Sequence, residues 1–176
     1  VTIPFKSVRA FGQSLIAVAM LLLVSTTLNA QVNTNGDFED GTTGWTFEGE
    51  SNATIEVAED PDDASNNVLQ VTLTDTAGLD AWSVQAFQTS NLTAGTEYTF
   101  SFRARASEDA TIQFDGGSGA QLWGQSISTD WTTFEAGPVS FENDTTLQYA
   151  IHFAHENNGE NVVLYVDDVA VEAAEE

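Results

Sequence analysis

The chain has 176 residues, of which 27 are Asp or Glu and four are Lys or Arg, so its formal net charge at pH 7 is −23. This excess of acids excludes nucleic-acid binding, because affinity for nucleic acids comes from Lys and Arg side chains that neutralise phosphates. Hydrophobic residues form 41% of the chain, which is enough for a folded core, and the absence of cysteine excludes disulfides.

Residues 1–30 have the features of a secretory signal peptide. Lys6 and Arg9 precede an apolar run from Leu15 to Val24, and small residues follow this run at a suitable cleavage point. A transmembrane helix needs about 20 apolar residues, so a membrane anchor is the weaker interpretation. The valine at the start of the chain fits either a non-standard bacterial start codon or a fragment boundary. We expect a secreted bacterial protein whose mature chain begins near Gln31.

From Gln31 onward the sequence shows short runs that alternate between apolar and polar residues, separated by clusters of Gly, Asn and Asp. We predict strands at Gly36–Glu39, Trp45–Glu48, Thr54–Ala58, Val68–Thr74, Trp82–Thr89, Glu97–Ala106, Thr111–Phe114, Leu122–Ile127, Thr132–Phe141, Thr145–Ala154 and Val162–Val171. Their spacing predicts an all-β fold, a jelly-roll β-sandwich of two antiparallel sheets that forms one domain over residues 31–172. Residues 173–176 are interpreted as the start of an acidic linker.

Acidic residues stand beside apolar anchors at both ends of this domain, in residues 35–39 and 165–169. If the first and last strands lie side by side, Glu39 and either Asp167 or Asp168 would converge on one hard cation, with backbone carbonyls as further ligands. The alternative, ordinary for so acidic a protein, is that these carboxylates are solvated.

Two predicted strands have a polar face that is not simply charged. The polar face of residues 98–105 carries Thr, Ser and two Arg, and that of residues 147–153 carries Gln148, Ala150 and His152. Such a face is typical of a binding groove, although a solvent-facing antiparallel sheet has a similar composition.

Tryptophans supply candidate stacking surfaces beside these faces. Trp82 and Trp123 lie in polar segments that contain glycine, so both are candidates for stacking on sugar rings, with burial in the core as the alternative for each. Trp45 and Trp131 each begin a predicted strand after a turn, so we expect them in core or strand-end packing.

Four segments in order resemble the carbohydrate-binding modules of the family 4, 9, 16 and 22 group: Asn35–Glu39, Gly44-Trp45, Leu92–Ala106 and Val166–Val169. The resemblance covers residues 33–172. The run Ile151-His152-Phe153, followed by an Asn/Gly loop and a Tyr-Val-Asp strand, is most similar to the family 4 modules attached to bacterial family 10 xylanases.

The resemblance implies a glycan-binding cleft across one sheet and a structural Ca²⁺ ion on the other side of the molecule. It implies that Trp82 is the stacking platform, with Gln85, Gln121, Trp123, Gln125 and His152 around it and Glu48 near one end. The implied calcium ligands are the carboxylates of Glu39 and Asp167 and backbone carbonyls at Asp37 and near Asn67.

The sequence departs from the xylan-binding modules at several of these positions. Gln85 stands in place of an acid, Gln125 in place of an arginine, and Ala120 in place of a second stacking aromatic. Trp123 stands in place of a tyrosine and would take over the second stacking contact. The cleft is therefore expected to persist while its glycan changes.

These features lead us to expect a non-catalytic module that binds a soluble β-glycan, xylan or a β-glucan, and that is attached to a catalytic domain. A glycoside hydrolase is one alternative, because so many carboxylates permit a pair at the required separation. A surface adhesin is another. No G-x-S-x-G, H-E-x-x-H or phosphate-loop motif is present, and His152 and His155 lie on opposite faces of a strand, which makes a poor zinc pair.

Overall fold

The computed structural model of the protein describes residues 30–174. The predictions of a signal peptide and of an acidic linker fall almost entirely outside these residues. The described part contains a 3₁₀ turn, η1 (Ala81–Ser83), and the strands β1 (Ala30–Gln31), β2 (Thr46–Glu48), β3 (Ala53–Asp60), β4 (Asp63–Leu73), β5 (Gln85–Leu92), β6 (Glu97–Ala106), β7 (Ala110–Asp115), β8 (Gln121–Ile127), β9 (Thr132–Ser140), β10 (Thr145–His152) and β11 (Val163–Ala173). None of its helical segments has the length and hydropathy needed to span a membrane.

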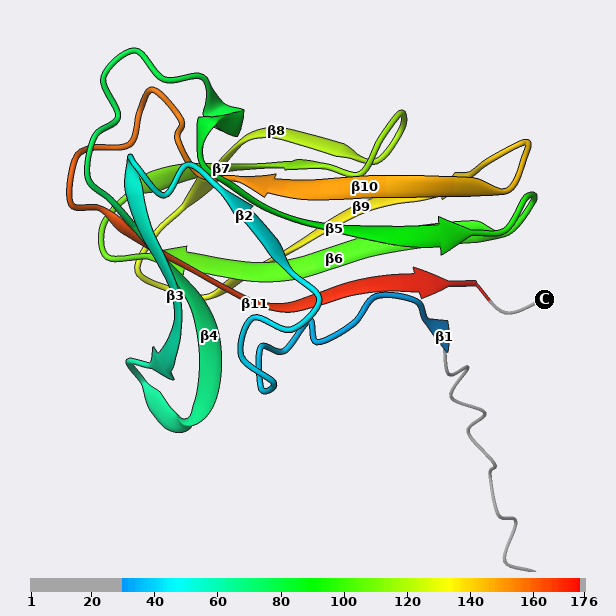
Figure 1. The fold of residues 1–176 in the computed structure, drawn as a ribbon, viewed down its shortest axis with the longest axis horizontal. Helices are drawn as coiled ribbons and strands as arrows, with labels where there is room; N and C mark the ends of the chain where they lie inside the picture. Colours follow the sequence, from blue (N-terminus) through cyan, green and yellow to red (C-terminus); the bar gives the residue numbers. More distant parts are fainter. Residues whose placement is uncertain (1–29, 175–176) are drawn as a thin grey trace, which may run out of the picture.

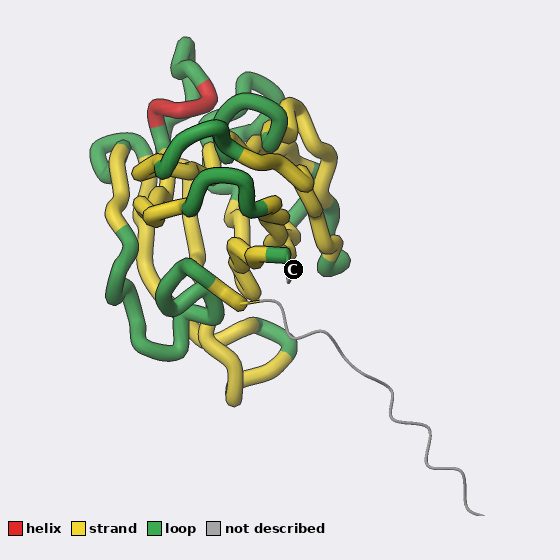
Figure 2. Tube along the Cα trace, turned by 90° about the vertical axis from the view of Figure 1, so that its right-hand side faces the viewer, coloured by secondary structure: helices red, strands yellow, loops and turns green. Residues whose placement is uncertain are grey.

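Two antiparallel sheets form two layers (Figure 1). Sheet A has the strand order β3-β4-β11-β6-β9, with β1 also paired to β11, and sheet B has the order β2-β5-β10-β7-β8. Every strand pair is antiparallel. Figure 2 shows the layers after a quarter turn, with η1 in red at one end of the sandwich. The prediction of an all-β jelly-roll sandwich is confirmed.

Most predicted strands have their observed positions within a few residues, and Glu97–Ala106 has the observed bounds. The predicted strand Gly36–Glu39 is wrong, because Asn35 and Phe38 have φ values of 48° and 54°, which turn the chain into a loop. The start of the predicted strand at Trp82 is also wrong, because this residue lies in η1.

Aromatic rings from both sheets meet in the centre of the core. The ring centre of Phe100 on β6 lies 5.6 Å from that of Phe114 on β7 and 5.8 Å from that of Tyr149 on β10. The ring centres of Phe102 and Phe114 are also 5.6 Å apart. Tyr149 donates a hydrogen bond to Gln88 Oε1 at 3.0 Å, and burial raises the pKa of Tyr149 to about 12. Because side chains alternate along a strand, β7 and β10 present their other residues on the outside of sheet B.

Trp45 closes the core beside the N-terminal loop, as the sequence predicted. Its side chain is 8% exposed, its ring stacks on Phe38 at 5.2 Å, and its Nε1 donates to the backbone oxygen of Asn35 at 2.9 Å. The Asn35 side chain donates in turn to the carbonyls of Gly41 and Thr43. Trp45 therefore holds the whole loop against the sandwich.

Replacing Trp45 with alanine removes this contact and leaves a cavity, so we expect Trp45→Ala to lower the free energy of unfolding by about 3–5 kcal/mol. The measurement is urea unfolding followed by circular dichroism. The control is Trp82→Ala, whose ring is mostly exposed and which should change stability little. Equal losses in the two variants would contradict the assignment of Trp45 to the core.

Candidate functional site

A groove with a volume of about 470 Å³ lies on the outer face of sheet B. Its lining residues are Trp82, Gln85, Asp115, Trp123, Gln148, Ala150 and His152. The volume lies within the range of about 300–1,000 Å³ that is usual for ligand sites. Four of the seven predicted sugar-binding residues thus line one groove.

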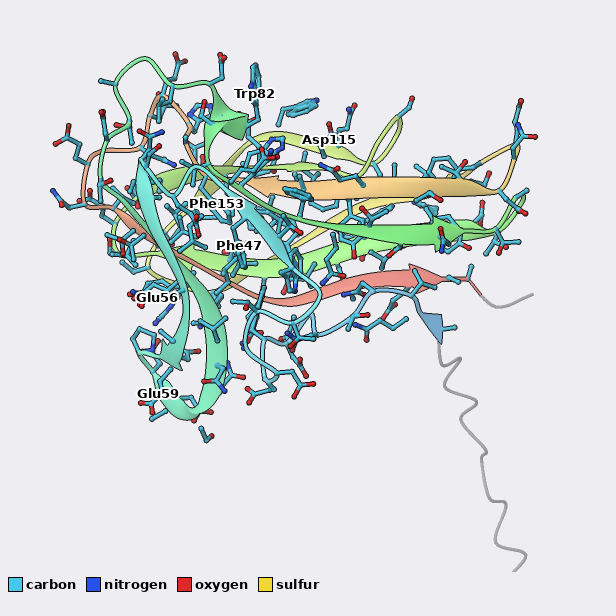
Figure 3. The ribbon with its side chains drawn as sticks, in the orientation of Figure 1. Phe47, Glu56, Glu59, Trp82, Asp115 and Phe153 are labelled. Atoms are coloured by element: carbon cyan, nitrogen blue, oxygen red, sulfur yellow. The ribbon has the colours of Figure 1, made fainter. Side chains whose placement is uncertain are left out.

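Trp82 stands at the edge of this groove on the short turn η1. The turn is fixed to the end of β10, since the backbone N of Ala154 donates to the oxygen of Ala81 at 3.2 Å and that of Phe153 to the oxygen of Val84 at 2.9 Å. Figure 3 shows Trp82 projecting away from the sheets, whereas Phe153 lies between them. With 57% of its surface exposed, Trp82 is available for stacking and is not a core residue.

Trp123 provides the second exposed ring, with 52% of its surface open to solvent, on the edge strand β8. Ala120, where related modules would have an aromatic, is fully buried in the turn before β8. The backbone oxygen of Ala120 accepts a hydrogen bond from Gly116, and its backbone N donates to Gly117. A side chain at position 120 therefore cannot face the groove, and Trp123 is the aromatic that does.

Gln125 is not brought into the groove. The register of β7 and β8 shifts between Ile112 and Phe114, and Gln125 pairs with Ile112, a core residue. Because directly paired side chains share a face, Gln125 lies on the opposite side of β8 from Trp123. Its Nε2 donates to the backbone oxygen of Trp123 at 2.9 Å. Simple alternation from Trp123 would place Gln125 on the groove face, but the bulge in β8 places it on the other face.

Glu48 and Gln121 lie at the two margins of the groove, each bonded to a lining residue. Gln85 Nε2 donates to Glu48 Oε2 at 2.6 Å, and Gln121 Nε2 donates to Asp115 Oδ1 at 3.1 Å. These bonds fix the orientation of both amides and both carboxylates before a ligand arrives.

His152 lies in the floor of the groove, between Gln85 on β5 and Gln113 on β7 in the strand register. It is 6% exposed, and its Nδ1 has no hydrogen-bond partner among the described residues. Burial lowers the pKa of His152, and the nearby charge of Asp115 opposes this effect. Buried polar atoms are normally paired, and this nitrogen, which is itself closed to solvent, is one of the few in the described chain that are not.

The groove is also lined by Asp115, Gln148 and Ala150, which the sequence did not identify as sugar-binding residues. Gln148 and Ala150 lie on the face with His152 that alternation along β10 identifies. Asp115 is one residue beyond the predicted end of its strand, so extending the alternation of β7 by one position would have found it. The groove therefore contains an acid that sequence reasoning did not expect there.

The two arginines of residues 98–105 do not share a face with His152, because β6 belongs to sheet A and β10 to sheet B. Arg103 and Arg105 lie 4.6 and 5.2 Å from the ring centre of Trp131, which thus packs on the outside of sheet A. Arg105 pairs with Asp60 and Asp62, and Arg103 with Asp167 and Asp168. The described part of the chain has no other Lys or Arg, so its groove face carries none.

Two of the predicted calcium ligands bond to neighbouring residues of β4, Asp167 to Asn66 and Glu39 to Asn67. Glu39 accepts hydrogen bonds from the backbone N of Asn67 at 2.8 Å and from its Nδ2 at 2.9 Å. Asp167 Oδ2 accepts from Asn66 Nδ2 at 2.9 Å, and Asp37 Oδ1 lies 3.4 Å from the backbone N of Glu39.

Asp167 and Asp168 differ in their surroundings. A bulge in β11 follows Asp167, and Asp168 has a φ of 49° at this bulge. Asp167 is fully buried, whereas 63% of the Asp168 side chain is exposed. Burial raises the pKa of Asp167, and hydrogen bonds from Asn66 and Arg103 oppose the rise. Asp167 is therefore the acid bonded to Asn66, whereas Asp168 lines a hollow together with Asp37.

The donor chemistry of the predicted ligands fits calcium, because carboxylates and carbonyls are the hard oxygen ligands that Ca²⁺ prefers. Within residues 30–174, no group of three or more His, Cys, Asp or Glu side chains is arranged for a metal. An ion held by Glu39 and Asp167 would therefore need backbone oxygens, such as those of residues 37 and 67, for most of its ligands. Arg103 already supplies positive charge to Asp167.

A sandwich with two exposed tryptophans over a polar groove defines a carbohydrate-binding class of protein. The family model described as "Carbohydrate binding domain" matches residues 30–167, and the chain belongs to this family. The resemblance found in the sequence is thus confirmed at the level of the family, which is typically non-catalytic. Comparison with curated proteins gives no significant match.

Solved structures share the fold. One described as "CBM4 structure and function" has a TM-score of 0.57 at 22% identity, over 80% of this chain and 99% of that chain. A Clostridium thermocellum structure of the CBM22-1 and GH10 modules of xylanase 10B, complexed with xylohexaose, has a TM-score of 0.59 at 15% identity, over 84% of this chain and 29% of that chain. The CBM22-1 xylan-binding domain of Paenibacillus barcinonensis Xyn10C has a TM-score of 0.52 at 16% identity, over 80% and 93%.

The buried His152 makes stability depend on pH. Its pKa in the folded state is below the ordinary 6.5, so the unfolded chain binds more protons once the pH falls under that value. We expect the free energy of unfolding to fall between about pH 7.5 and 5.5, and to fall less in His152→Gln. Urea unfolding across this range is the measurement. The same slope in His152→Gln and wild type would contradict the assignment.

Proposed function

We propose that the protein is a non-catalytic module that binds a neutral, soluble β-glycan chain, xylan or a β-glucan, in the groove on sheet B. The observation that carries this proposal is the pair of exposed rings, Trp82 and Trp123, that flank a polar floor formed by Gln85, Asp115, Gln148 and His152. Aromatic rings stack on the apolar faces of sugars, and amides, carboxylates and imidazole bond to hydroxyl groups.

The charges near the groove favour a neutral glycan over a polyanion. Glu48 and Asp115 lie at its margins, and both arginines of the described chain are paired with acids on the other sheet. A polymer that carries uronic acids would meet only like charge, which opposes its association. A neutral chain avoids this repulsion and still offers hydroxyl donors to the carboxylates.

Binding without catalysis agrees with how the groove carboxylates are used. Glycoside hydrolysis needs two carboxylates placed on either side of the scissile bond, one of them as an acid. Glu48 and Asp115 instead each accept a hydrogen bond from a glutamine amide. The proposed role is to hold an attached enzyme near its polymer, which raises the local substrate concentration. Export by the predicted signal peptide would place the protein where such polymers occur.

We expect Trp82→Ala to weaken binding of the best glycan at least about tenfold, equivalent to about 1.4 kcal/mol, with little change in melting temperature. His152→Ala should weaken binding less, because it removes one hydrogen bond among several. Affinity electrophoresis against soluble xylan, mixed-linkage β-glucan, laminarin and mannan selects the glycan, and calorimetry measures the affinities.

The matched control for Trp82 is Gln125→Ala, which changes the strand that carries Trp123 but on the side away from the groove. It should leave the affinity unchanged. Binding by Trp82→Ala as tight as by the wild type, or unfolding of that variant, would overturn the location of the site. Release of reducing sugar by the purified protein would favour the hydrolase alternative.

The proposal includes a structural calcium ion at Glu39 and Asp167, remote from the groove. A ligand that binds only the folded state stabilises it by about 2.7 kcal/mol at one hundred times its Kd. We expect EDTA to lower the melting temperature of the wild type and not that of Glu39→Ala, with glycan affinity retained below the melting range. Asp130→Ala, an exposed acid elsewhere, should keep the wild-type response to EDTA. An unchanged wild-type melting curve in EDTA would contradict the calcium site.

A further inference from the structure

Trp82 borders two hollows, and the proposed function uses only one of them. The second has a volume of about 220 Å³ and is lined by Leu79, Asp80, Ala81, Trp82, Gln113, His155 and Glu156. Trp82 is the residue common to both linings. Nothing in the sequence assigned a role to this region, where His155 was interpreted only as half of a poor zinc pair.

The floors of the two hollows are adjacent. His152 lines the first hollow and Gln113 lines the second, and these residues are directly paired across β10 and β7. Side chains opposite each other in such a pair have their Cβ atoms about 4.5–5.5 Å apart. The floor therefore continues from one hollow to the other beneath the exposed ring of Trp82.

The wall of the second hollow is held in place before any ligand binds. Asn158, buried behind His155 and Glu156, accepts a hydrogen bond from the backbone N of Thr111 at 2.7 Å and donates to the oxygens of Thr111 and Phe153 at 2.8 Å each. The two bonds to Thr111 tie the loop after β10 to β7, and the bond to Phe153 lies within the loop. Little conformational entropy remains to be lost there when a ligand binds.

The chemistry of the second hollow suits the hydroxyl groups of a sugar. Asp80 and Glu156 accept hydrogen bonds, and the amide of Gln113 both donates and accepts. His155 Nδ1 accepts a bond from the backbone N of Asn157 at 3.2 Å, which leaves Nε2 as the donor of the neutral ring. The two acids disfavour an anionic ligand, as Glu48 and Asp115 do in the first hollow.

We propose that the glycan-binding groove continues past Trp82 into this second hollow, so that one chain occupies both and Trp82 stacks on a sugar in the middle of the bound segment. This inference rests on the proposed function. A long chain then fills both hollows, whereas a short oligosaccharide fills the hollow between the two tryptophans and reaches nothing beyond Trp82.

The test compares chain lengths by calorimetry on the purified protein, with the tri- and hexasaccharides of β-1,4-xylan and of β-1,4-glucan as probes. The wild type should bind the hexasaccharide of the preferred series at least about tenfold more tightly than the trisaccharide. Glu156→Ala and Gln113→Ala should each weaken the hexasaccharide about three- to tenfold, the worth of one hydrogen bond, and leave the trisaccharide unchanged.

The matched control is Glu160→Ala, an exposed acid of the same loop outside the lining of the second hollow, which should bind both lengths as the wild type does. Hexasaccharide affinity unchanged in both test variants, or lowered equally for both lengths, overturns the extension while the groove on sheet B stands. Failure of the wild type to bind any probe overturns the proposed function and this inference together. Melting temperatures of the variants exclude misfolding as a cause.

Discussion

The contact between aromatic rings of the two sheets is the constraint on which the groove depends. Phe114 and Tyr149 point inward because they meet Phe100, and no other orientation buries three large rings at once. A strand that turns one residue inward turns the next outward, so Asp115, Gln148 and Ala150 are fixed on the outer face by the same packing. A one-residue slip of β7 or β10 would bury these polar groups and expose the rings, which makes the groove floor as well specified as the core.

The two outer faces of the sandwich are used differently. On sheet A, Arg103 and Arg105 lie against Trp131 and pair with acids of β11 and of the hairpin between β3 and β4, which extends from the sandwich in Figure 3. Each of the two arginines is thus paired with two acids on this face. On sheet B, the residues that would cover the face are small or are bonded to each other, and the exposed rings stand at its margin. Among the described residues, the exposed large aromatic rings stand at sheet B, which makes it the face suited to stacking on sugars.

Alternation and turn residues were sufficient to predict the sandwich and the strand Glu97–Ala106, because both depend on local pattern. The gathering of Trp82, Gln85, Trp123 and His152 followed instead from the resemblance to a known family. The predictions were wrong where contacts between residues far apart in the sequence determine the position of a side chain. The bulge in β8 that turns Gln125 away has no signal in the apolar pattern. The arginine face of β6 was wrongly assigned to the groove, because the sequence does not show which sheet contains that strand. Asp115 was missed for a simpler reason, since its strand was predicted one residue too short.

The arrangement of the rings limits what the groove can discriminate. Trp82 is held by backbone bonds between η1 and the end of β10, whereas Trp123 stands on an edge strand beside Gly124, whose φ of 62° and open surroundings leave the local backbone less constrained. Stacking alone separates glycans poorly, because sugars of many kinds have an apolar face. Discrimination must therefore come from the hydrogen-bonding groups whose positions are fixed, His152 in the floor and the amide and carboxylate pairs at the two margins.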